Sequence, residues 1–206
     1  MKLPVLTPET MPIKGQKLLD KVKKDFIGLS TKYKVADGST KKRIYLDTTA
    51  SSLMMGVAHR AANKFLKHYS NTHSLLHFSA KISTKTYNWI HKKILEFVHA
   101  DPNEFTCFFM GSGVTAGMNR MAKTLKRLQP EKDIILISIM EHHSNDLPHR
   151  KHGGKVMHVP ISTEGNSMGG INLELLEKYL IQFQGRVNYV SVTGLSNVTG
   201  ILNPIN

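Results

Sequence analysis

The second half of the chain alternates between short apolar runs and amphipathic segments. Apolar runs of strand length are followed by stretches in which apolar side chains recur every three or four residues, the period of a helix with one buried face. The pattern predicts strands at residues 133–138, 155–160 and 187–192, with helices between them. Alternating strands and helices are joined by right-handed crossovers and build a mainly parallel sheet. The sequence therefore predicts an α/β fold with three layers.

The first part of the chain has a different pattern. Residues 1–43 are rich in lysine and interrupted by prolines, and they predict a basic N-terminal arm with one helix near residues 14–29 and a polar loop at 30–42. A short strand is expected at 44–46, and helices are expected at about 54–69 and 83–99. Residues 44–206 are then expected to form the folded part of the chain that follows the arm.

A glycine-rich turn in the middle of the chain joins an aromatic segment to a helix. Phe105–Met110 predicts a buried strand, and the apolar positions after residue 117 have helical spacing. Glycine permits positive φ and lets a bound group approach the backbone. The first turn of a helix offers unpaired N–H groups that bind anions, and Thr115 adds a hydroxyl. We interpret the turn as a phosphate cradle, the alternative being a tight turn that needs glycine only for its geometry.

Two other sites fit parts of the same sequence. The pattern Gly111-x-Gly113-x-x-Ala116 matches a dinucleotide-binding fingerprint of an oxidoreductase domain, with Glu141 as the acid for the ribose. A metal site would use imidazole ligands, although neither a cysteine nor a carboxylate cluster accompanies them. Its candidate ligands are His142, His143, His149 and His152.

Polar turns follow three of the predicted strands. They are the cradle at residues 111–119, the segment Glu141–Asn145 and the segment Ser196–Gly200. Because the carboxyl ends of parallel strands lie at one edge of a sheet, and ligands bind at that edge, we expect the three turns to converge on one site.

Five segments together stand in the order and at the spacing of a known family. They are residues 45–51, 71–73, 111–119, 141–145 and 196–200. The set resembles the class V aminotransferase family of pyridoxal 5'-phosphate (PLP) enzymes, which includes the cysteine desulfurases, over roughly residues 44–206. The resemblance implies part of a fold-type I PLP-dependent transferase large domain. It also implies PLP as cofactor, an amino-acid substrate and a homodimer in the full-length family.

The resemblance also implies roles for particular residues. Gly113, Val114 and Thr115 correspond to the cup for the PLP phosphate. His142 corresponds to the residue that stacks on the pyridine ring, and Asn197 to the side chain that hydrogen-bonds the ring's phenolic oxygen. The loops that line the substrate side would contribute Thr49, Ala50, His73 and His77.

The sequence also departs from the family pattern. Val114 stands where the family usually has Thr or Ala, and His73-Ser74-Leu75 stands where desulfurases have His-Arg-Gly. The sequence reaches Asn206 without the Ser-x-His-Lys whose lysine forms the Schiff base and without the aspartate for the pyridine nitrogen. We therefore expect an N-terminal half that lacks the Schiff-base lysine and is inactive alone. A non-catalytic, truncated or partner-dependent half-domain is the alternative.

Composition narrows the remaining classes of function. The chain has 206 residues and a formal net charge of +13, but its lysines are spread along the sequence, so nucleic-acid binding is not expected. No apolar run has the length of a membrane span, and the N-terminus lacks an apolar leader. A single cysteine, Cys107, excludes an internal disulfide. These features predict a cytoplasmic protein.

Overall fold

The computed structural model describes residues 14–165 and 168–205, so the first 13 residues of the expected basic arm lie outside the described residues. The chain divides by packing into two compact units. The N-terminal unit extends to Phe108, and the C-terminal unit begins at Phe109.

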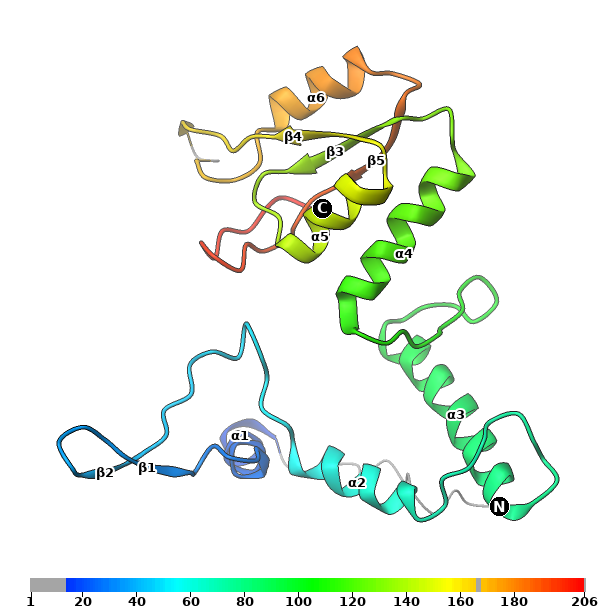
Figure 1. The fold of residues 1–206 in the computed structure, drawn as a ribbon. Coiled ribbons are helices and arrows are strands. Elements are labelled where there is room, and N and C mark those ends of the chain that lie inside the picture. The colour runs from blue at the N-terminus through cyan, green and yellow to red at the C-terminus, as the bar shows by residue number, and fades with distance from the viewer. Residues whose placement is uncertain (1–13, 166–167, 206) are drawn as a thin grey trace. The chain divides into compact units, whose positions relative to one another are not determined.

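A parallel sheet forms the centre of the C-terminal unit (Figure 1). Its middle strand, β3 (Ile134–Ser138), pairs with β4 (Lys155–Val159) on one side and with β5 (Val187–Ser191) on the other. Every residue of β3 is buried, as expected for a central strand covered on both faces. The three strands lie within one residue of their predicted positions, since each is a local apolar run.

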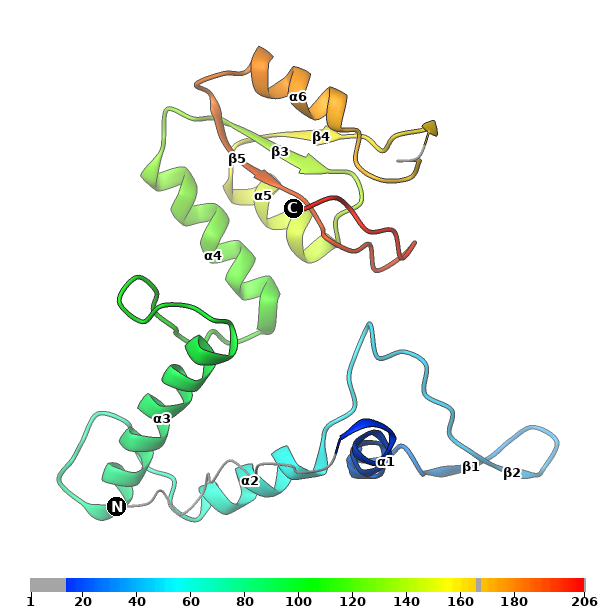
Figure 2. The same ribbon diagram turned by 180° about the vertical axis from the view of Figure 1, so that it is seen from behind.

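Helices cover both faces of this sheet (Figures 1 and 2). On one face, α6 (Leu173–Gln182) packs over a core that contains Ile134 and Leu136 of β3. On the opposite face lies α5 (His143–His152), which packs against α4 (Gly113–Leu128). The α/β, three-layer, mainly parallel fold predicted from the sequence is therefore confirmed.

Asparagine side chains fix two of these helices. The Asn172 side chain accepts a hydrogen bond from Leu175 N at 2.9 Å and so caps α6. Asn188 of β5 donates from Nδ2 toward the carbonyl oxygens of Leu125 and Gln129 at the end of α4 and toward that of Lys132 in the turn that follows, each at 3.3 Å. Since the last carbonyls of a helix lack partners within the helix, Asn188 anchors the end of α4 to the sheet.

The N-terminal unit contains three helices and a hairpin among its described residues. The helices are α1 (Gly15–Asp25), α2 (Gly56–Leu66) and α3 (Phe78–Phe97), and the hairpin strands are β1 (Lys32–Lys34) and β2 (Thr40–Lys42). The Asp25 carboxylate accepts from Val57 N at 2.7 Å and pairs with Arg60 at 2.9 Å. An acid at the end of α1 therefore caps the start of α2.

Several local predictions were wrong. Residues 44–46 and 105–110 form no strand, and Leu46 and Phe109 are 87% and 59% exposed. β-favouring side chains fit a half-buried pleated surface, but they do not supply the neighbouring strand that a sheet requires. Conversely, the hairpin lies where a polar loop was predicted, with Gly38 of its turn at φ 80°. Within residues 14–165 and 168–205, no helix is both long enough and apolar enough to cross a membrane.

Candidate functional site

The start of α4 is open to an anion. Ser112 and Gly113 both adopt the left-handed conformation, with φ of 61° and 62°. In the described chain no side chain caps this helix, and its first turn carries no acidic residue. A Cβ placed on Gly113 would meet no atom within 4 Å. The first N–H groups of this 16-residue helix therefore have no capping side chain in the described chain, and they lie at the positive end of its dipole.

A pocket of about 330 Å³ joins this helix to the turn after β3. Thr115 lies in the first turn of α4, and Asn119 follows one turn later and donates from Nδ2 to the Thr115 carbonyl at 2.8 Å. The other wall comes from α5 and the residue before it. The pocket is lined by Thr115, Asn119, His142, His143, Ser144, Leu147, Pro148 and Lys151.

The imidazole of His142 is held in one orientation. His142 caps α5: its Nδ1 accepts from Ser144 N at 3.0 Å and lies 2.8 Å from Ser144 Oγ. Both contacts restrain this ring nitrogen at the start of α5, while the residue itself stays exposed. A flat, oriented ring on the pocket wall suits stacking against an aromatic ligand.

Asn197 lies on a loop that leaves the carboxyl end of β5. The base of the loop is closed by Asn203, whose Nδ2 donates to the Thr193 carbonyl at 2.8 Å. Within the loop, Ser196 Oγ accepts from Thr199 N at 3.2 Å. Asn197 is exposed and does not line the pocket that Thr115 and His142 share.

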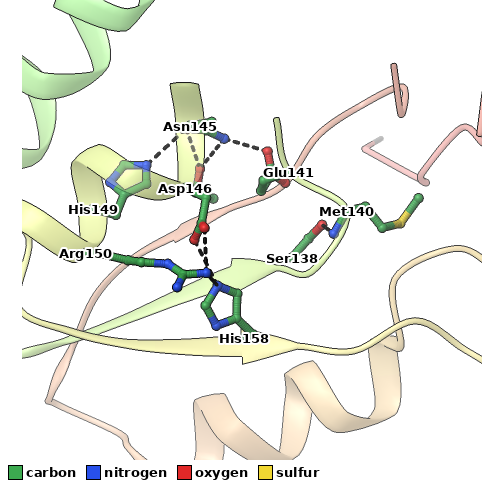
Figure 3. A network of polar contacts seen from close by, with 9 residues as sticks. Ser138, Met140, Glu141, Asn145, Asp146, His149, Arg150 and His158 are labelled. Atoms are coloured by element: carbon green, nitrogen blue, oxygen red, sulfur yellow. Dashed lines mark hydrogen bonds and ion pairs between the residues drawn. The ribbon is translucent and has the colours of Figure 1, made fainter. Parts of the chain in front are cut away.

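A carboxylate joins the His142 turn to the start of this loop. One oxygen of Glu141 accepts from Asn145 Nδ2 at 2.6 Å, and the other accepts from the backbone N–H of Thr193. Asn145 Nδ2 also donates to Ser191 Oγ at 2.9 Å, at the end of β5. Figure 3 shows Asn145 between Glu141 and His149. The turns after the neighbouring strands β3 and β5 are thus tied together.

His149 extends this network into the interior. The side chain is fully buried, with Nε2 3.0 Å from Asn145 Oδ1 and Nδ1 2.7 Å from the Tyr189 hydroxyl. Burial lowers the pKa of His149, against the opposing charge of Asp146, and raises the pKa of Tyr189 to about 12. The ring is therefore neutral: Nε2–H donates to Asn145, and Nδ1 accepts from Tyr189.

A second polar cluster links α5 to β4. Asp146 pairs with Arg150 at 2.6 Å and with His158 Nε2 at 2.9 Å (Figure 3). Burial alone raises the pKa of Asp146, but the hydrogen bonds and charges of Arg150 and His158 outweigh it and leave the pKa lowered. This cluster anchors the helix that begins after His142.

The site residues predicted from the sequence lie in both units of the chain. In the C-terminal unit, Gly113 and Thr115 lie at the start of α4, His142 faces the same pocket as Thr115, and Val114 is 72% exposed. In the N-terminal unit, His77 caps α3, its Nδ1 accepting from Ala80 N at 3.3 Å, and His73 N donates to Asn71 Oδ1 at 3.2 Å. The exposed residues Thr49 and Ala50 belong to a turn.

The structure does not support the two alternative sites. The dinucleotide fingerprint needs a strand before its glycines, and residues 105–110 form none. Both oxygens of Glu141 already accept hydrogen bonds from the protein. For a metal, both ring nitrogens of His149 are engaged by Asn145 and Tyr189, so His149 cannot join His152 as a ligand. In the described ranges no three His, Cys, Asp or Glu side chains form a group that could hold a metal ion.

Sequence reasoning did not find several residues of this site. Lys151 lines the pocket two helical turns beyond His143, and its only signal was the helical spacing His143, Leu147, Lys151. The roles of Asn145 and Ser191 depend on contacts across 46 residues, which no local pattern indicates.

Comparisons of the sequence and of the structure with known proteins all find similarity to class V aminotransferases and cysteine desulfurases. The family model described as "Aminotransferase class-V" matches residues 44–206. A probable cysteine desulfurase of Halalkalibacterium halodurans is 30% identical over 79% of this chain and 39% of its own length. A cysteine desulfurase of Escherichia coli is 28% identical over 91% of this chain and 44% of its own. The apo structure of a cysteine desulfurase from Thermococcus onnurineus matches with a TM-score of 0.68 and 25% identity, over 90% of this chain and 42% of that protein. The chain thus spans about two fifths of the length of these relatives.

Proposed function

The chain belongs to the class V aminotransferase family, which uses PLP, and on that premise we propose that its C-terminal unit holds PLP. The observation that carries the proposal is the shared pocket of Thr115 and His142, which combines an uncapped helix start with an oriented aromatic ring. A phosphate dianion suits the first feature, and a pyridine ring suits the second.

Each residue has a distinct task in this proposal. The N–H groups of Gly113 to Thr115 and the Thr115 hydroxyl hold the phosphate. His142 stacks on the ring, and Asn197 donates a hydrogen bond to its phenolic oxygen. Lys151, on the opposite wall, adds positive charge near the anion. When bound, PLP supplies an aldehyde that condenses with amino groups and a ring that withdraws electrons from the substrate's α-carbon.

The substrate class that follows is an amino acid, since the aldehyde reacts with a primary amine. The relatives named cysteine desulfurase support cysteine, whereas His73-Ser74-Leu75 departs from the desulfurase pattern. Thr49, Ala50, His73 and His77 are proposed to line the substrate side.

Binding titrations test the cofactor assignment. The 206-residue chain is titrated with PLP, inorganic phosphate and NAD by calorimetry, together with His142→Ala. We expect PLP to bind at least tenfold more tightly than phosphate, about 1.4 kcal/mol, because the ring adds contacts. The His142→Ala variant should lose most of that difference and keep its phosphate affinity. Equal affinities for PLP and phosphate in the native chain would refute the proposal, as would preferred binding of NAD.

A non-catalytic, partner-dependent role is the second candidate. The 206-residue sequence contains one His-Lys pair, His91-Lys92, and Lys92 lies exposed within α3 of the N-terminal unit. We propose that the chain alone binds PLP without turning over amino acids. Borohydride reduction of the PLP-treated chain, with peptide mapping and a turnover assay, tests this proposal. One stoichiometrically labelled lysine together with turnover would contradict it.

A further inference from the structure

Resting on the proposed function, we propose that Glu141 is a positioning residue that keeps His142 and Asn197 in register before the cofactor binds. Glu141 contacts neither the cup nor the pocket; it acts through the two segments that carry the ring-binding side chains. Its backbone neighbour is His142, and its carboxylate bonds the N–H of Thr193, four residues before Asn197.

The two segments have few other ties near the site. His142 follows β3 and Asn197 follows β5, and these parallel strands pair only as far as Ile137 and Ser191. Beyond that point, Glu141 bonds Thr193 directly, and Asn145 bonds Ser191. Asn203 adds a weaker tie: its Nδ2 lies 3.6 Å from Met140 Sδ and donates to the Thr193 carbonyl at 2.8 Å. The Glu141 carboxylate is the contact that bonds directly from the residue beside His142 to the backbone that leads to Asn197.

The hydrogen bonds call for an acceptor at each of the two side-chain oxygens of Glu141, and Figure 3 shows the part of the chain of contacts that runs from His149 through Asn145 to Glu141. Tyr189 donates to His149, His149 donates to Asn145 Oδ1, and this leaves the Asn145 amide nitrogen to donate to Glu141. The other oxygen of Glu141 faces a second donor, Thr193 N–H. A neutral amide at position 141 would set an NH₂ group against one of these donors in either orientation.

This polarity allows a reciprocal exchange as the test. Glu141→Gln creates a clash of donors, and Asn145→Asp alone places two carboxylates side by side. The double variant E141Q/N145D reverses the polarity: the introduced glutamine donates, and the introduced aspartate accepts from it, from His149 and from Ser191. Glu177→Gln, an exposed position on α6, is the matched control.

Two ligands separate positioning from general destabilisation. Inorganic phosphate needs only the cup, whereas PLP also needs the ring contacts of His142 and Asn197. We expect each single variant to bind PLP about tenfold more weakly, or about 1.4 kcal/mol, and to keep the phosphate affinity of the native chain. The double variant should recover at least half of the lost PLP binding, on a logarithmic scale, and the control should match the native chain.

Each outcome supports or overturns the inference. A Glu141→Gln variant with native PLP affinity refutes it, and so does equal loss of PLP and phosphate binding, which indicates a general structural role. If a single variant does not fold, as judged by circular dichroism, the double variant decides, and its failure to bind PLP overturns the inference. If the native chain itself shows no preference for PLP over phosphate, the proposed function fails and the inference fails with it.

Discussion

Replacing Gly113 with valine perturbs the cup at its first residue. A Cβ at this position would meet no atom of the surrounding structure within 4 Å, so the added Cβ itself creates no clash. The backbone φ of 62° is left-handed, however, and costs a residue with a side chain about 1–2 kcal/mol. That part of the effect appears as reduced stability. The branched side chain also fills the space in front of the first N–H groups of α4, where the proposed phosphate binds.

We expect Gly113→Val to weaken phosphate and PLP binding at least tenfold, about 1.4 kcal/mol, in a chain that still folds. Calorimetric titration with each ligand measures the change, and urea unfolding measures the loss of stability. Gly117→Val is the matched control: it lies one turn further along α4, at a glycine without positive φ, and its Cβ also meets no atom within 4 Å. The control should bind both ligands as the native chain does. If folded Gly113→Val binds phosphate and PLP as the native chain does, the phosphate does not bind at this helix start.

Two further predictions concern the C-terminal unit. Because burial lowers the pKa of His149, the folded protein resists protonation there; stability should be full above about pH 6.5 and fall as the pH drops through the folded pKa. Urea unfolding between pH 8 and 5 measures this, and His149→Gln should show a shallower dependence; identical profiles would exclude His149 as the cause. Lys151→Met should weaken phosphate binding about two- to fivefold at low salt, and the effect should disappear at high salt, as is typical of an exposed charge. Lys155→Met, at the start of β4, should leave phosphate binding unchanged. Equal effects of the two substitutions on phosphate titrations would refute a local role for Lys151.

The strands of the central sheet could be predicted because their information is local. Residues 134–137 form a continuous apolar run, and the structure buries every residue of the strand that this run begins, Ile134–Ser138. Phe105–Met110 has an equally strong β pattern, yet it forms no strand. A side-chain pattern reports what a segment suits, and pairing depends on which other segment lies beside it. The hairpin at residues 32–42 was not predicted, because its side-chain pattern is weak although its two strands do pair. The strands are short and exposed, and only Asp37-Gly38 indicates the turn.

The candidate site was predictable in its parts and not in its connections. The glycines and Thr115 indicate an anion site by residue type, and the family resemblance directed attention to His142 and Asn197. Glu141 was placed in the polar turn 141–145, but the role given to its own side chain was that of a ribose acid, because its bond to Thr193 spans 52 residues and has no local signal. The neutral, buried state of His149 likewise follows from the packing of Tyr189 against it, not from spacing along the chain.

The most direct test of the proposed cofactor site is to locate PLP on the chain. Backbone amide chemical shifts of the ¹⁵N-labelled protein are recorded during a titration with PLP, and again with inorganic phosphate. We expect both ligands to shift the amides of Gly113, Val114 and Thr115, and PLP alone to shift those of His142 and Asn197 as well. Largest shifts elsewhere, or identical patterns for the two ligands, would contradict it.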